Sequence, residues 1–170
     1  SRRPFYKYFK SKLEVLESLY ELSTSLLLSR FEAEMASSSN MNEFVSYCVS
    51  EYFDYHVQLG PLVRILNEEA VGFESPLAHH RNKVLERLVQ MFNDKYYELE
   101  GTRVDPQIYY ALIWAMECAA NKLLTGTEST EEEVTRVKRC MSAFAGCVVV
   151  SDQSQRPRLP TILEPASIVC

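Results

Sequence analysis

A chain of 170 residues is long enough for one domain or two small ones. With 46% hydrophobic and 24% charged residues it has the composition of a folded globular protein, which argues against disorder. It has no apolar run of the ~18 residues that a membrane span needs, no Gly-rich phosphate loop, and few glycines for an all-β fold.

The net charge of -5 is unevenly distributed. Residues 1–12 contain five basic and no acidic side chains, whereas the rest of the chain has 13 basic and 23 acidic ones. A basic end on an acidic body indicates a local anionic partner, either nucleic acid or a membrane surface. A solvated basic arm is the alternative.

The first long helix is predicted from residue 12 to about residue 35. It follows Ser11, which stands three residues before Glu14 as in a capping box. The residues expected to face the core recur at helical spacing. They are Leu13, Leu16, Leu19, Tyr20, Leu26, Leu27 and Phe31.

Capping boxes, prolines and glycines mark the helices that follow. Asn40 and Thr130 each stand three residues before a Glu, and prolines stand where a first helical turn tolerates them. Helix-ending glycines are expected at Gly60, Gly101 and Gly126. The predicted helices cover residues 41–59, 61–72, 76–100, 106–124 and 131–150. The fold class is therefore all-α.

Residues 151–170 contain three prolines and no helical period, which predicts an extended C-terminal tail. We expect its apolar side chains to pack in a groove of the body or of a partner subunit. These side chains are Leu159, Ile162, Leu163, Ile168 and Val169.

The five cysteines form no CxxC pair. The interior ones, which lie in apolar runs, are expected to be small buried hydrophobic residues in a reducing, cytoplasmic compartment. No set of His, Cys or carboxylates has the spacing of a zinc site, and no nucleophile motif is present. The sequence predicts no metal, no cofactor and no enzyme activity, with a helical enzyme kept as a minor alternative.

The opening residues combine aromatic and basic side chains. Phe5 and Phe9 lie four residues apart and can share a buried face, while Tyr6, Lys7 and Lys10 then point outward. Phenol and ammonium groups both donate hydrogen bonds to phosphate oxygens, which suits a contact with a nucleic-acid backbone.

This opening resembles the recognition helix and following turn of TetR/AcrR-type transcriptional regulators, a bacterial family. The matching residues are Ser1, Arg2, Phe5, Tyr6, Tyr8, Phe9, Ser11 and Lys12, continued by Glu14 to Leu16. Pro4 departs from the Thr or Ser usual there. The resemblance implies a TetR-like helical bundle. Beyond this motif, the chain resembles the family in its order of helices rather than in its sequence.

The resemblance also implies a domain organisation. Residues 1–11 correspond to the last part of a helix-turn-helix, residues 12–150 to an effector-binding and dimerisation domain with a connecting helix over 12–35, and residues 151–170 to the tail. We expect the natural protein to carry two further short helices before residue 1. The residues expected to contact DNA are Arg2, Arg3, Tyr6, Lys7, Tyr8 and Lys12.

In that family the helical body binds a small effector. The expected lining is aromatic with a few polar groups, as small-molecule sites are built. It consists of Phe31, Tyr52, Tyr55, His56, Met91, Tyr109, Trp114 and Glu117. A plain helical core with hydrogen-bonded tyrosines is the alternative interpretation.

Small residues on the last two predicted helices indicate a close helix contact. Under the resemblance these helices pair with their copies in a homodimer, while packing within one subunit is the alternative. The interface is expected to consist of these small residues and the larger apolar ones beside them: Ala111, Ala115, Ala119, Val137, Met141, Phe144, Gly146 and Val148. A dimer would match a palindromic operator with half-sites about 34–36 Å apart or a multiple of it.

Together these features predict a ligand-responsive, DNA-binding regulator. We expect a repressor that a small, largely apolar effector releases from double-stranded DNA, with no membrane partner. The alternative from another class is an all-helical dimeric interaction module that does not bind DNA.

Overall fold

The computed structural model describes residues 9–72, 74–125 and 130–150, and this part of the chain is helical, without a strand. The all-α class is therefore confirmed. The helices are α2 (Lys12–Ser37), α3 (Met41–Leu59), α4 (Pro61–Val71), α5 (Ala78–Glu100), α6 (Pro106–Leu124) and α7 (Glu131–Val149).

Polar caps start the helices where the sequence predicts them. The side chains of Ser11, Asn40 and Thr130 each accept a hydrogen bond from the backbone N–H three residues later, at 3.1, 2.9 and 3.2 Å. A cap of this kind stabilises a helix by about 1 kcal/mol. Glycines end two of the helices: Gly60 and Gly101 have φ values of 46° and 72°, a region that residues with a Cβ rarely adopt.

Two helix bounds differ from the prediction by two residues, and the ends of α4 and α7 differ by one. Helix α2 continues two residues beyond position 35, and α5 begins at Ala78 rather than at Pro76. The later start of α5 has a local cause, because Ser75 first closes a turn. Its hydroxyl accepts from the N–H of Leu77 at 3.1 Å and its carbonyl accepts from Ala78 at 3.0 Å.

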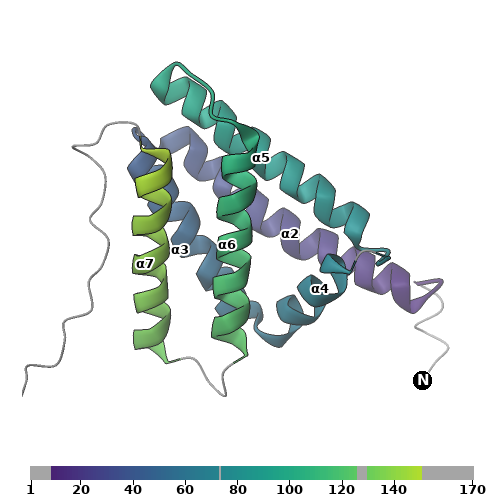
Figure 1. Ribbon diagram of the computed structural model, residues 1–170. Coiled ribbons are helices and arrows are strands. Elements are labelled where there is room, and N and C mark those ends of the chain that lie inside the picture. Colours follow the sequence, from purple (N-terminus) through teal and green to yellow (C-terminus); the bar gives the residue numbers. More distant parts are fainter. Residues whose placement is uncertain (1–8, 73, 126–129, 151–170) are drawn as a thin grey trace, which may run out of the picture.

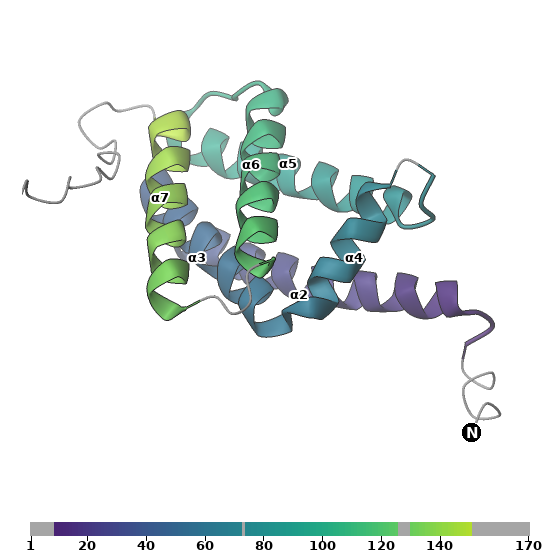
Figure 2. The same ribbon diagram turned by 60° about the horizontal axis from the view of Figure 1, so that its bottom comes forward.

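Helices α6 and α7 form an antiparallel pair that stands across the long helices α2 and α5 (Figure 1). Helix α3 packs on α7, α6 and α2, and α4 connects its end to the start of α5. The first turns of α2 extend beyond the rest of the body, toward the N-terminal end of the chain (Figures 1 and 2).

Apolar side chains form two separate clusters. The main core joins α2, α3, α5, α6, α7 and, through Val63, the first turn of α4 around Phe44 and Phe53, whose side chains are fully enclosed. Burying a side chain of this size contributes about 2–3 kcal/mol. A small second cluster holds α4 between the first half of α2 and the start of α5; it consists of Tyr20, Leu66, Ala70 and Leu77.

The buried face of α2 is narrower than predicted. Tyr20, Leu27 and Phe31 are buried, but Leu13 and Leu26 are 38% and 47% exposed, so the expectation for these two leucines was wrong. Leu26 lies about 100° around the helix from Leu27 and so points away from the core. Leu13 shares the stripe of Tyr20 but lies in the first turn of α2.

The middle of α2 is rich in hydroxyl side chains that hydrogen-bond to the helix's own backbone. Each donates to a carbonyl three or four residues earlier, at 2.8 to 3.0 Å. Such bonds slightly destabilise a helix and favour bending. The residues are Ser18, Ser23, Thr24, Ser25 and Ser29.

The interior cysteines differ from the expectation of uniform burial. Cys48 is buried, Cys140 and Cys147 are half-buried, and Cys118 is exposed. All four are free thiols. Residues 108–116 of α6 are all apolar and cover its whole circumference, so the apolar run does not identify the buried face, and Cys118 lies on the exposed one.

Candidate functional site

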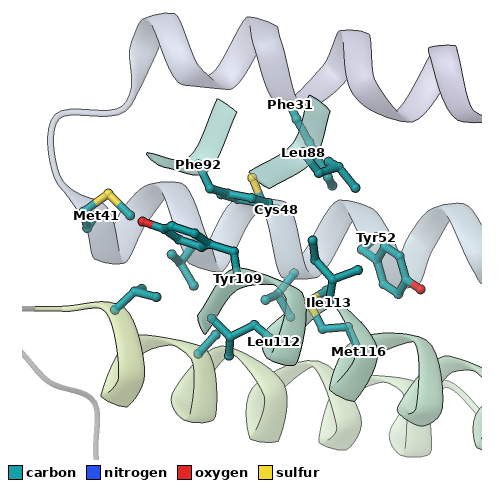
Figure 3. Close-up of a pocket in the computed structure, with 14 residues that line it drawn as sticks. Phe31, Met41, Cys48, Tyr52, Leu88, Phe92, Tyr109, Leu112, Ile113 and Met116 are labelled. Atoms are coloured by element: carbon teal, nitrogen blue, oxygen red, sulfur yellow. The ribbon is translucent and has the colours of Figure 1, made fainter. Parts of the chain in front are cut away.

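A partly open cavity of about 50 Å³ lies between α2, α3, α5, α6 and α7 (Figure 3). A cavity needs roughly 10–15 Å³ to hold one water molecule, so this one has room for a small group of atoms. Its walls are almost entirely apolar. They are made by Phe31, Met41, Val45, Cys48, Val49, Tyr52, Leu88, Phe92, Tyr109, Leu112, Ile113, Met116, Ala145 and Val149.

Helical spacing explains how two helices supply most of these walls. Helix α3 contributes residues 41, 45, 48, 49 and 52, and α6 contributes residues 109, 112, 113 and 116. Both sets follow the i, i+3, i+4, i+7 pattern that places side chains on one face of a helix. The cavity therefore lies where these two faces meet.

Aromatic rings stiffen the side of the cavity formed by α5. The Phe92 ring is stacked on Tyr109, with centroids 5.9 Å apart and planes at 14°. It also contacts Phe31 and Phe44, at centroid distances of 6.3 and 5.5 Å. Such pairs each add about 0.5–1.5 kcal/mol beyond the area that they bury.

The hydroxyl of Tyr109 has no hydrogen-bond partner in the described part of the chain, although the side chain is only 2% exposed. Figure 3 shows this hydroxyl directed toward Met41, another wall residue, whereas the hydroxyl of Tyr52 points toward the opposite end. Burial, with the nearby Tyr96, raises the pKa of Tyr109, so its phenol stays protonated and able to donate. An unsatisfied buried hydroxyl costs about 1–3 kcal/mol.

A polar cluster adjoins the Tyr52 end of the cavity. Arg81 of α5 and Glu117 of α6 form an ion pair at 2.5 Å, and both side chains are largely shielded from solvent. Burial raises the pKa of Tyr20, Tyr52 and Tyr55; for Tyr20 and Tyr52, Arg81 opposes and Glu117 reinforces this shift. The ion pair in this cluster links α5 to α6.

His56 is buried and fully hydrogen-bonded within this region. Its Nδ1 lies 2.8 Å from the carbonyl oxygen of Tyr52, and its Nε2 lies 3.3 Å from Nδ2 of Asn67. These partners fit a neutral ring that donates from Nδ1 and accepts at Nε2. Burial lowers the pKa of His56 to about 4, although the hydrogen bond to the Tyr52 carbonyl acts in the opposite direction and raises it.

The eight residues expected to line a pocket are distributed over three environments. Phe31, Tyr52 and Tyr109 line the cavity. Tyr55, His56 and Glu117 belong to the polar region beside Tyr52. The other two lie outside the cavity walls: Met91 is buried in the main core, and Trp114 is 52% exposed on α6.

Sequence reasoning missed several partners of these residues. Arg81 and Asn67 carry no motif that predicts their contacts with Glu117 and His56. Lys95 is also unexpected, because it is 1% exposed and pairs with Glu98 at 3.2 Å. The purely aliphatic walls of the cavity have the same sequence pattern as an ordinary helical core.

The predicted DNA-contacting residues lie mostly beyond the described residues. Of these, Arg2, Arg3, Tyr6, Lys7 and Tyr8 fall outside, as do the five apolar tail residues. Lys12 is exposed and is the first residue of α2, directly after the cap Ser11. At this point a helix presents free N–H groups and a positive dipole, which favour an anionic partner.

The predicted interface residues lie at different depths on α6 and α7. Ala111, Phe144 and Val148 are exposed; Ala115, Ala119, Val137 and Met141 are half-buried; and Gly146 is buried within the chain. Ile108 and Trp114 add exposed apolar surface to α6. These two helices thus present large apolar side chains to the outside.

Over residues 9–72, 74–125 and 130–150, no group of three or more His, Cys, Asp or Glu side chains is placed to hold a metal ion. Within the same ranges, no helix has both the length and the hydropathy to cross a bilayer.

No family model, no curated protein and no solved structure matches the chain. The TetR-like arrangement that the opening residues suggest therefore stays a prediction.

Proposed function

We propose that the protein is a ligand-responsive, DNA-binding transcriptional regulator, a repressor whose affinity for DNA falls when a small apolar effector occupies the cavity. The observation that carries this proposal is the course of α2. One end of this helix is Lys12, the last residue of the basic segment, residues 1–12. Near its other end, the side chain of Phe31 lines the cavity. The two positions are about 28 Å apart along the helix axis.

Contacts along α2 support a coupling between the cavity and the basic segment. Glu32 pairs with Arg87 of α5 at 2.8 Å, and Arg30 pairs with Glu51 of α3 at 2.9 Å. An effector that needs more room than about 50 Å³ must move wall residues, and Phe31 is one of them. Such an effector favours a second position of α2, by no more than its difference in affinity for the two states.

The proposal includes a homodimer through α6 and α7. The exposed side chains of Trp114 and Phe144 support it, because large apolar groups are enriched at protein interfaces. Two basic segments in one dimer would contact two half-sites of a palindromic operator.

The DNA-binding half of the proposal is tested by selecting bound duplexes from a random pool with the full-length protein. We expect enrichment of a palindrome, and an affinity that falls linearly with the logarithm of salt concentration. Lys12→Ala should weaken binding to all sequences and reduce the magnitude of the salt slope by about one. Lys122→Ala, which removes an exposed lysine of α6, is the matched control and should change neither.

The second candidate function is a dimeric interaction module without DNA binding. The observation that favours it is the same exposed apolar surface of α6 and α7, which needs no DNA to explain it. A full-length protein that enriches no sequence and shows no salt-dependent DNA binding, yet forms a stable dimer, would decide for this module.

A further inference from the structure

The hydroxyl of Tyr109 is a buried hydrogen-bonding group to which the described part of the chain supplies no partner. The ring is held in place by its stack on Phe92, so the hydroxyl has one defined direction, toward Met41 (Figure 3). Buried polar groups in folded proteins almost always have a partner, and an exception calls for an explanation.

We propose that the cavity binds a small, neutral, largely apolar molecule with one hydrogen-bond acceptor, such as a ketone, ester or ether oxygen, which accepts a hydrogen bond from Tyr109. This inference rests on the proposed ligand-sensing function and names the chemical class of its ligand.

The walls select for a neutral ligand. None of the fourteen wall residues carries a charge at neutral pH. An anionic or cationic ligand would lose its hydration without gaining a partner of opposite charge, which is strongly unfavourable. The raised pKa of Tyr109 keeps its proton in place, so the phenol offers a donor to an acceptor oxygen.

The size of the cavity bounds the ligand. An engineered apolar cavity of about 150 Å³ in another protein holds benzene, whereas this one measures about 50 Å³. A molecule of a few heavy atoms fits this volume, but the walls cover the hydroxyl of Tyr109, so the ligand oxygen reaches it only when Met41 moves. A larger one must displace Met41 and Met116, whose unbranched side chains can repack around it.

Two matched pairs of probes test the proposal. The first pair is 2-butanone and 2-methyl-1-butene, and the second is acetophenone and α-methylstyrene. Within each pair the shape is nearly the same, but a carbonyl oxygen replaces a terminal CH₂ group. Binding to the full chain is followed by NMR of methionine methyl groups, since Met41 and Met116 line the cavity and Met91 does not.

We expect at least one ketone to shift the Met41 and Met116 signals with saturation. Tyr109→Phe should weaken the binding of that ketone about tenfold, because the ketone oxygen then enters the cavity without a hydrogen-bond donor. The matching alkene should bind the variant as well as the wild type, within twofold. Tyr110→Phe removes a neighbouring hydroxyl that does not line the cavity, and should change neither affinity.

Three results would overturn the inference: no probe shifts the Met41 and Met116 signals, Tyr109→Phe weakens ketone and alkene equally, or it leaves ketone affinity unchanged. The melting temperature gives a further check. Removing a hydroxyl without a partner should leave it unchanged or raise it, and a marked fall would show that the hydroxyl is bonded within the protein.

The outcome is separable from that of the proposed function. A ketone that binds through Tyr109 without changing DNA affinity would support the cavity chemistry and contradict the regulator. An effector that releases DNA equally well from wild type and Tyr109→Phe would support the regulator and contradict the role of Tyr109.

Discussion

His56 is held in its neutral form by burial and by two hydrogen bonds that suit the uncharged ring. Its pKa is about 4 in the folded protein, against 6.5 in an exposed chain. As the pH falls below about 6.5, the unfolded chain therefore takes up a proton that the folded protein does not. The contribution of His56 to stability is complete above this pH and is lost progressively as the pH falls toward 4.

We expect the free energy of unfolding to fall by about 2 kcal/mol between pH 7 and pH 5 through His56 alone. Urea denaturation of wild type and His56→Gln at both pH values measures this contribution as the difference in their pH dependence. His79→Gln, at an exposed histidine, is the control and should keep the wild-type dependence. Equal pH dependence in all three proteins would contradict the assignment of a buried neutral ring.

The sequence alone could predict some of the individual residues of the candidate site. Phe31, Tyr52 and Tyr109 were predicted because an aromatic lining with a few polar groups suits a pocket, and they do line the cavity. Trp114 met the same criterion but lies outside, since it is five residues from Tyr109 and points to a different side of α6. The unpartnered state of Tyr109 depends on what surrounds its hydroxyl in space, which no local pattern specifies.

Helix α6 shows why ends of helices are easier to predict than their faces. Its start follows from Asp105, whose side chain accepts from the N–H of Gln107 at 2.9 Å, and from a proline in the first turn. These interactions span a few residues and depend on residue type alone. The orientation of the helix depends on its partners, because both Ile113 inside and Ile108 outside are apolar.

The exposed apolar surface of α6 and α7 leads to a prediction about assembly. Trp114→Glu and Phe144→Glu should each convert a homodimer to a monomer, because each places a charge in an interface core that excludes water. Both side chains are exposed in the single chain, at 52% and 41%, so the fold itself should be preserved. Analytical ultracentrifugation measures the mass, and circular dichroism confirms the helical content.

Val71→Glu is the control for this experiment. Val71 is 62% exposed on α4 and lies outside the proposed interface, so its substitution should leave the dimer intact. A wild-type protein that is monomeric at all concentrations, or a dimer that survives both α6 and α7 substitutions, would exclude this interface.

At the scale of the whole molecule, the proposed regulation requires α2 to transmit movement between its two ends. Ser25 and Ser29 are exposed in its middle, and their hydroxyls donate hydrogen bonds to the backbone of α2 itself. Replacing both with glycine should increase bending there, at a cost of about 0.5 kcal/mol per site. We expect this variant to bind effector normally but to lose most of the effector-induced change in DNA affinity.

The matched variant with alanine at Ser25 and Ser29 should keep or enlarge that change, because alanine stiffens the helix and removes the hydroxyls bonded to its backbone. Fluorescence anisotropy of labelled operator DNA, with and without effector, compares the variants. If the glycine and alanine variants respond alike, the signal does not travel along α2.

The division of the apolar residues into two clusters has a consequence for how the molecule opens. The small cluster of Tyr20, Leu66, Ala70 and Leu77 buries far less surface than the main core, so its cooperative local unfolding costs less free energy. Amide protons of the second half of α4 and of the first turns of α2 should then exchange with solvent through this partial opening, while those of α3 exchange only through complete unfolding. The N-terminal end of α2 should therefore unfold and refold many times before the main core unfolds once.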